Sequence, residues 1–208
     1  MSLEKEVKLY FVRHGETQYN VEGRMQGFCD SPLTDRGISQ AKSVGKGLSG
    51  IEFKAIYSSE SQRVIDTANH AIGHLNIPIT TDPRLKEMNF GALESLLESE
   101  ISDRYGDILK KLFALTDLHM SAPEGESYSQ LYTRTTSVIQ EIVEKHKHEG
   151  GNILIFSHGV TIGNYLMQLT KMKEYPHHDN CSVSVIKYYN GNFEVEKIAD
   201  TSFRDLHF

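Results

Sequence analysis

An apolar stretch that ends abruptly in charged and polar residues constrains this chain more than any other feature. Val7 and the run 9–12 have the composition of a buried strand, and Arg13-His14-Gly15 follow immediately. In open α/β sheets, ligands bind just beyond the carboxyl ends of the strands. The sequence therefore predicts a fixed positive charge and an imidazole at the place where such a sheet binds its ligands.

Further apolar segments follow along the chain. Strands are predicted at 7–12, 55–57, 77–79 and 153–156, and two more, at 182–188 and 192–198, flank Asn190-Gly191, a common two-residue hairpin turn. Helical stretches lie between the first four strands. The sequence therefore predicts a three-layer αβα fold with a mostly parallel central sheet, helices on both faces and an antiparallel hairpin at an edge near the C-terminus.

Three of the predicted helices have recognisable start signals. Thr34 is expected to cap the first of them. Two later helices are expected to open with capping boxes, formed by Ser59 with Gln62 and by Ser127 with Gln130.

Composition narrows the class of protein. The chain has 208 residues, of which 38% are hydrophobic and 24% charged, as in ordinary globular domains. We expect a single domain over 1–208, with a helical excursion around 92–126 inside it. The formal net charge of −6 disfavours general binding to nucleic acid or to anionic membranes. Any anion site must therefore be a local basic pocket.

The sequence also predicts a cytoplasmic protein. The charged start runs directly into a strand and leaves no room for a signal peptide, and no apolar run is long enough to span a bilayer. Cys29 and Cys181 are too few for a disulfide framework and match no metal-ligand spacing, so free thiols are expected.

Two histidines share one local design. His14 and His158 each follow a predicted strand and precede a glycine, which allows a tight turn and a close approach to a ligand. Because parallel strands release their carboxyl ends at one edge of the sheet, we expect both histidines there. Arg63, in the first turn of a predicted helix, and Glu87, after the third predicted strand, are expected at the same edge.

These side chains suit phosphoryl transfer without a metal ion. Neutral His14 would attack phosphorus and form a phosphohistidine. Arg13 and Arg63 would grip the phosphoryl oxygens, and a protonated His158 would add a third cationic donor. Glu87 would protonate the leaving oxygen and then take a proton from the attacking water.

The order of these motifs resembles the histidine phosphatase superfamily, which includes the cofactor-dependent phosphoglycerate mutases. The resemblance spans nearly the whole chain and is carried by Leu-Tyr-Phe-Val-Arg-His-Gly-Glu-Thr at 9–17, by 30–37, by 57–59 with Arg63, by 123–127 and by 157–159. It implies that His14 is the nucleophile, that Glu87 is the proton donor, and that the phosphate pocket is formed by Arg13, Arg63 and His158.

The resemblance also implies a substrate side to the site. Asn20, Gln26 and Gly27 would line it, and Gly159 would let the backbone approach the phosphate. The region 92–126 would act as a cap that decides substrate specificity.

One departure from the mutase pattern favours a phosphatase. Mutases of this family tend to follow the catalytic glutamate with arginine and tyrosine, whereas Met88-Asn89 follow Glu87 here. The chain is also shorter than typical mutases. The resemblance therefore favours a metal-independent phosphomonoester hydrolase that acts on a small phosphorylated metabolite and needs no cofactor. The alternatives are a phosphoglycerate mutase primed by 2,3-bisphosphoglycerate and a non-catalytic module that binds a phosphorylated ligand.

Other assignments stay open. The carboxylates of Glu94, Glu124 and Glu126 are alternatives to Glu87. The sequence does not decide between a monomer and a homodimer.

The histidine-rich segments are the remaining metal candidates. They are His177-His178-Asp179 and His146 with His148, and neither has an obvious third ligand. We expect these histidines to be exposed and the chain to hold no metal.

Overall fold

A computed structural model describes residues 3–173 and 175–205 of the chain. The strands are β1 Val7–Arg13, β2 Phe53–Ser58, β3 Ile79–Thr81, β4 Gly151–Ser157, β5 Val183–Tyr189 and β6 Asn192–Asp200. The helices are α1 Gln18–Glu22, α2 Asp35–Leu48, α3 Gln62–Ile72, α4 Glu98–Tyr105, α5 Ile108–Phe113, α6 Tyr128–His146 and α7 Gly159–Thr170, with 3₁₀ turns at Pro83–Leu85 and Gly91–Leu93.

The strands form one sheet in the order β3-β2-β4-β1-β5-β6. Neighbours from β3 to β1 are parallel, whereas β5 runs antiparallel to both β1 and β6. Asn190 and Gly191, both at positive φ, form the turn between β5 and β6. The predicted fold class is confirmed, including the antiparallel hairpin at the edge.

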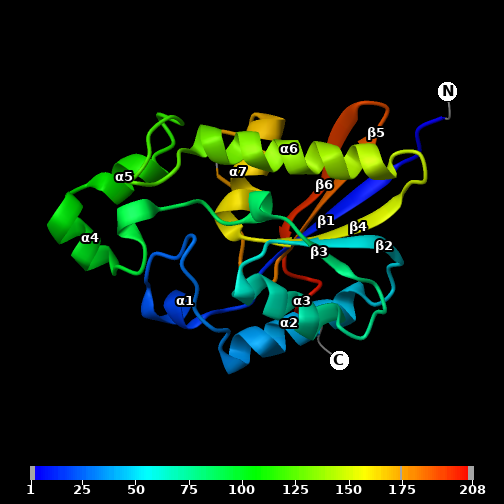
Figure 1. Ribbon diagram of the computed structural model, residues 1–208, viewed down its shortest axis with the longest axis horizontal. Coiled ribbons are helices and arrows are strands. Elements are labelled where there is room, and N and C mark those ends of the chain that lie inside the picture. The colour runs from blue at the N-terminus through cyan, green and yellow to red at the C-terminus, as the bar shows by residue number, and fades with distance from the viewer. Residues whose placement is uncertain (1–2, 174, 206–208) are drawn as a thin grey trace.

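Helices cover both faces of the sheet, with α6 and α7 on one side and α2 and α3 on the other (Figure 1). The alternation of side chains along β1 explains why both faces are apolar. Val7, Leu9 and Phe11 pack in the cluster that contains α6 and α7, whereas Val12 packs in the cluster that contains α2 and α3. The sheet is therefore buried on both sides, as parallel sheets require.

Between β3 and α6 the chain leaves the sheet and forms α4 and α5, which project beyond the layered body (Figure 1). This region has its own apolar cluster, in which Met88, Phe90 and Leu93 meet Ile101 and Leu112. The predicted excursion is helical over α4 and α5, whereas 94–97 and 114–126 form turns and irregular segments. Gly106, at positive φ, separates the two short helices.

One predicted start signal is wrong and two are confirmed. Thr34 caps α2, and Ser127 forms a reciprocal capping box with Gln130 at α6. Helix α3, however, begins after Ser61 rather than after Ser59, and Ser61 makes no capping hydrogen bond. Instead Asp30 accepts a hydrogen bond from the Gln62 amide across 2.6 Å. A carboxylate from a distant loop satisfies this helix end, which local sequence cannot show.

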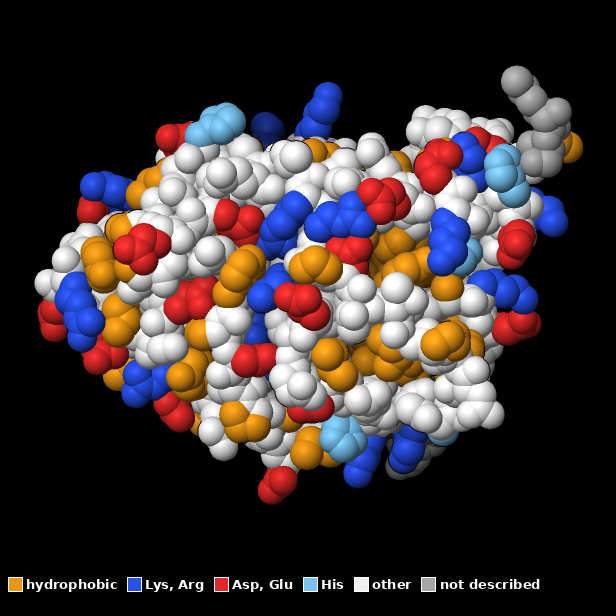
Figure 2. Space-filling view, viewed as in Figure 1, with side chains coloured by type: hydrophobic (Ala, Val, Ile, Leu, Met, Phe, Trp, Pro, Cys, Tyr) orange, Lys and Arg blue, Asp and Glu red, His pale blue; other side chains and the backbone are white. Residues whose placement is uncertain are grey.

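The described residues contain no helix that is long and apolar enough to cross a membrane. Lys and Arg side chains are intermixed with Asp and Glu over the face shown in Figure 2.

Candidate active site

The sheet brings the two motif histidines together. Strands β1 and β4 are parallel neighbours, with Arg13 opposite Ser157, so His14 and His158 follow at adjacent carboxyl ends. The His14 amide donates to the Ser157 carbonyl across 3.1 Å, and the two imidazole ring centres lie 5.4 Å apart. The predicted meeting of these residues at one edge is confirmed.

His14 is buried, with 3% of its surface exposed. Its Nδ1 lies 2.8 Å from the Gly15 carbonyl oxygen. A carbonyl only accepts, so Nδ1 carries the proton and Nε2 carries the lone pair. Burial lowers the pKa of His14 well below its ordinary value, and the charges of Arg63 and Arg13 lower that pKa further. The lowered pKa favours the neutral form of His14, which is the form that a nucleophile needs.

Two buried guanidinium groups each keep an unpartnered nitrogen. The Nε atoms of Arg13 and Arg63 are buried and have no hydrogen-bond partner. Arg13 donates from Nη1 to the carbonyl of His178, and Arg63 is saturated through its two Nη atoms. Buried donors are almost always paired, so these two nitrogens are hydrogen-bonding capacity that the protein itself leaves unused.

His158 has a partner at each ring nitrogen. Its Nδ1 lies 3.0 Å from Nη2 of Arg63, and its Nε2 lies 2.9 Å from Oγ of Ser59. An arginine only donates, so Nδ1 of His158 must accept and the ring is neutral. Burial lowers the pKa of His158 well below its ordinary value, and Arg63 lowers it further. His158 is therefore neutral in this structure, and its protonation during phosphoryl transfer stays a prediction.

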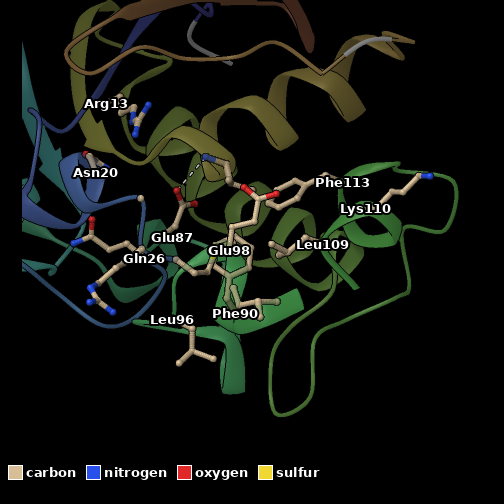
Figure 3. A pocket seen from close by; sticks show the side chains of 15 residues that line it. Arg13, Asn20, Gln26, Glu87, Phe90, Leu96, Glu98, Leu109, Lys110 and Phe113 are labelled. Atoms are coloured by element: carbon tan, nitrogen blue, oxygen red, sulfur yellow. Dashed lines mark hydrogen bonds between the residues drawn. The ribbon is translucent and has the colours of Figure 1, made fainter. Parts of the chain in front are cut away.

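Glu87 lies at the same edge, 5% exposed, against the start of α7. Its Oε2 accepts from the Val160 amide across 3.1 Å (Figure 3), and its Oε1 accepts from the Thr161 amide and hydroxyl, each across 2.9 Å. The Met88 amide donates to Oε1 as well, across 3.0 Å. A helix N-terminus offers unpaired amides, which explains why the carboxylate sits there.

A cavity of about 490 Å³ opens over this edge, within the usual range for small-molecule sites. Arg13, Asn20 and Gln26 line one side of it, and Glu87 lies between them and an apolar wall (Figure 3). That wall and its rim come from the region between β3 and α6 and from α7: Phe90, Leu96, Glu98, Ile101, Leu109, Lys110, Phe113 and Val160.

The four residues predicted for the substrate side occupy different places. Asn20 and Gln26 line the cavity, although the Gln26 amide also bonds within its own loop, to Thr17 and Ser31. Gly27 contributes its carbonyl to Arg63 across 2.8 Å.

Gly159 packs against the guanidinium of Arg13. A Cβ atom at Gly159 would lie 3.2 Å from Nε of Arg13, so this position favours the smallest residue.

The alternative carboxylates are engaged elsewhere or exposed. Glu126 pairs with Arg134, and Glu94 accepts from backbone amides of the loop at 28–29. Glu124 is exposed at a residue with positive φ. Of these carboxylates, Glu87 is the one that lines the cavity.

The histidines of the two metal candidates were predicted to be exposed, and this is wrong for two of them. His146 and His178 are buried. His146 Nε2 lies 3.1 Å from the Tyr57 hydroxyl, and His178 Nε2 lies 2.8 Å from the Ser184 hydroxyl. In 3–173 and 175–205, no group of three or more His, Cys, Asp or Glu side chains is arranged to hold a metal ion.

Sequence reasoning missed several residues that hold the site. Ser59 contacts His158, and Asn180 donates from Nδ2 to the His14 carbonyl across 3.1 Å. Thr67 Oγ1 accepts from the Gly15 amide across 3.0 Å. None of the three lies beside its partner in sequence. Ser59 belongs to the motif at 57–59, but its contact with His158 has no local signal.

Comparison with known proteins identifies the family that the sequence motifs resemble. A family model described as the histidine phosphatase superfamily (branch 1) matches residues 9–201. The probable phosphoglycerate mutase GpmB of Enterobacter sp. (strain 638) is 31% identical over 208 residues, covering 96% of this chain and 95% of that protein.

Solved structures also match over most of the chain. Phosphoglycerate mutase from Bacillus anthracis str. Sterne has a TM-score of 0.88 at 30% identity, covering 96% of each chain. Mycobacterial glucosyl-3-phosphoglycerate phosphatase, in a complex with VO3, has a TM-score of 0.82 at 25% identity, covering 93% of this chain and 98% of that one. Since the family model covers almost the whole sequence, the chain belongs to branch 1 of the histidine phosphatase superfamily and is a phosphoryl-transfer enzyme.

Proposed function

We propose that this protein hydrolyses phosphomonoesters through a phosphohistidine on His14. The observation that carries the proposal is the pair of buried, unpartnered Nε atoms of Arg13 and Arg63 beside a neutral imidazole. A phosphoryl group would supply acceptors for both nitrogens, and guanidinium groups match its oxygens.

In the first step, the Nε2 lone pair of His14 attacks phosphorus. The Nε2–P bond forms as the bond from phosphorus to the ester oxygen breaks, and Glu87 transfers its proton to that oxygen. Arg13 and Arg63 stabilise the charge on the phosphoryl oxygens. The hydrogen bond from Nδ1 to the Gly15 carbonyl, 2.8 Å long, fixes the ring and takes up part of the charge that the nucleophile gains.

In the second step, Glu87 takes a proton from water, and the water oxygen attacks the phosphohistidine. The new P–O bond forms as the Nε2–P bond breaks, which returns neutral His14 and releases inorganic phosphate. Because Glu87 is held by donors from the start of α7, its carboxylate stays in place between the two proton transfers.

The cavity wall supports hydrolysis over return of the phosphoryl group to a bound acid. Phe90, Leu109 and Phe113 form an apolar side, and Lys110 directs its ammonium group away from Glu87 (Figure 3). A mutase that retains an acidic sugar phosphate would need a free cation for the substrate carboxylate. Arg24 also lines the cavity, but its guanidinium group is paired with Glu22 across 2.6 Å. Met88, where mutases tend to carry arginine, is fully buried in the apolar cluster of this region.

A phosphoglycerate mutase is the second candidate, because that activity is in the names of the GpmB relative and the Bacillus anthracis structure. Priming by 2,3-bisphosphoglycerate would be needed only in that case. We propose that neither reaction needs a metal ion, since Arg13 and Arg63 would repel a divalent cation from the phosphate pocket.

Side chains of α4 and α5, among them Ile101, Leu109 and Phe113, line the cavity. We therefore propose that the region 92–126 is the cap that selects the small phosphorylated metabolite.

The test is phosphate release from a panel of phosphomonoesters, with and without chelator, beside an assay of 3-phosphoglycerate with catalytic 2,3-bisphosphoglycerate. We expect phosphate release that is insensitive to chelator, with little interconversion of 3- and 2-phosphoglycerate. Rapid interconversion with little release would establish the mutase instead. A protein that shows neither activity and does not become phosphorylated by any of the phosphomonoesters would instead be a binding module.

A further inference from the structure

A carboxylate outside the catalytic set joins the cap region to the loop beside the phosphate pocket. Glu94 follows the 3₁₀ turn Gly91–Leu93. Its Oε1 accepts from the Phe28 amide across 2.8 Å and from the Phe90 amide across 3.1 Å, and its Oε2 accepts from the Cys29 amide across 2.6 Å. One side chain thus satisfies three backbone donors from two distant segments.

The loop packs closely on this carboxylate. A Cβ atom at Gly27 would lie 2.4 Å from Oε1 of Glu94 and 2.4 Å from the Met88 carbonyl. Beside it, Met25 exchanges backbone hydrogen bonds with Ser95 and Leu96, 2.8 and 2.9 Å long. Residues 24–30 and 94–97 therefore form one connected unit, which we call the clamp.

The clamp in turn orients Arg63. Nη2 of Arg63 donates to the Gly27 carbonyl across 2.8 Å, and Nη1 donates to the Cys29 carbonyl and to Asp30, each across 2.9 Å. Three acceptors from one loop fix the plane of a guanidinium group. The direction of its remaining nitrogen, the unpartnered Nε, follows from that plane.

We propose that Glu94 is a positioning residue for phosphate binding: it holds the backbone at 27–30, and this backbone aims Arg63 at the phosphoryl group. The inference rests on the proposed function, since it takes the orphaned Nε of Arg63 to be a phosphate ligand. Glu94 also links the cap to the phosphate pocket, because Phe90 and Leu96, which line the cavity, flank Glu94 in the chain.

Glu94→Gln tests this with little change in shape. An amide keeps one acceptor oxygen but puts an NH₂ group against backbone donors, so at least one clamp hydrogen bond is lost. We expect binding of inorganic phosphate to weaken about tenfold, in line with the loss of a buried hydrogen bond to a charged group. KM for an aryl phosphate should rise more than kcat falls. Glu94→Asp, which keeps both acceptor oxygens, should retain more of the phosphate affinity than Glu94→Gln.

Glu100→Gln is the matched control. Glu100 belongs to the same region and also accepts from a backbone amide, that of Leu97, across 2.8 Å. Its partners, the Leu97 amide and the Arg24 guanidinium 3.7 Å away, lie at the outer ends of the clamp and not in the loop at 27–30. Its replacement should therefore leave the dissociation constant for phosphate unchanged.

A double-mutant cycle separates positioning from a general structural role. Phosphate binding is measured by calorimetry on the full chain for wild type, Glu94→Gln, Arg63→Gln and the double variant. If Glu94 acts through Arg63, its replacement should have no further effect once Arg63 is gone. The pKa of His158, followed by NMR in Glu94→Gln alone, gives a second readout, because a displaced Arg63 should let that pKa rise.

Two outcomes would overturn the proposal while leaving the proposed function in place. One is unchanged phosphate affinity and an unchanged His158 pKa in Glu94→Gln. The other is an equal tenfold loss with and without Arg63. A wild-type protein that binds no phosphate would instead overturn the proposed function, and the role of Glu94 with it.

Discussion

Arg63 donates a hydrogen bond from Nη2 to Nδ1 of His158, across 3.0 Å. The arginine cannot accept, so this contact holds the imidazole neutral and leaves its Nε2–H facing the Ser59 hydroxyl, 2.9 Å away. The second motif histidine is therefore neutral in this structure. It is part of the same hydrogen-bonded group as the arginine.

Arg63→Gln should raise the pKa of His158 toward the ordinary histidine value. Burial, the larger cause of the lowered pKa, would remain, so the rise should be partial. NMR titration of the imidazole resonances measures it. Arg36→Gln, a change at an exposed arginine, is the control and should leave the resonance unmoved. An unchanged titration in Arg63→Gln would contradict the electrostatic account.

His14→Ala should reduce turnover by about 10⁴-fold, because no other group would accept the phosphoryl group. The fold should persist, since the deletion removes one ring from a pocket at the sheet edge. Steady-state kinetics and thermal unfolding check both expectations. His74→Ala, at an exposed histidine, should retain full activity. Substantial turnover by His14→Ala would rule out this residue as the nucleophile.

Glu87→Gln should affect substrates according to their leaving groups. A glutamine keeps acceptor oxygen but carries no transferable proton, so alkyl phosphates should lose about 10²–10⁴-fold in kcat. Aryl phosphates, whose leaving oxygens need little protonation, should lose far less in a single-turnover measurement of phosphohistidine formation. Equal losses on the two classes would place the proton donor elsewhere.

Gly159→Ala should separate phosphate affinity from stability. The added Cβ would lie 3.2 Å from Nε of Arg13 and displace the guanidinium by a few tenths of an ångström. Gly159 is the first residue of α7 and lies outside the helix interior, so the exchange should change helix stability little. Weaker phosphate binding with a nearly unchanged Tm is the expected pattern. Unchanged affinity would show that Arg13 adapts freely.

The free energy of unfolding should fall as pH decreases from about 6.5 toward 4. Burial lowers the pKa of His178 to about 4, and His14 and His158 also have lowered pKa values. In this window the unfolded chain binds protons that the folded protein excludes, so folding is progressively penalised. Urea unfolding at several pH values measures the slope, which should be shallower in His178→Gln. An identical slope in the variant would exclude His178 as a contributor.

The layered fold was predictable because its signals are local. The apolar stretch before Arg13 and the one before Ser157 each have the composition of a buried strand, and Asn190-Gly191 is a turn that dictates an antiparallel hairpin. The capping boxes show the limit of such signals. Ser127 caps its helix through a neighbour in sequence, whereas α3 is capped by Asp30 from another loop.

The chemistry that the chain carries, and the sheet edge where it lies, can be read from residues 7–15, because a strand followed by Arg13 and His14 places those groups wherever the strand ends. The protonation state of His158 and the orientation of Arg63 come instead from contacts between distant segments. Whether His158 is charged depends on Arg63 and on burial, and where Arg63 points depends on carbonyls of the loop that Glu94 holds. These contacts join segments far apart in the chain, and a hydrogen bond between distant segments leaves no trace in the spacing of residues along either one.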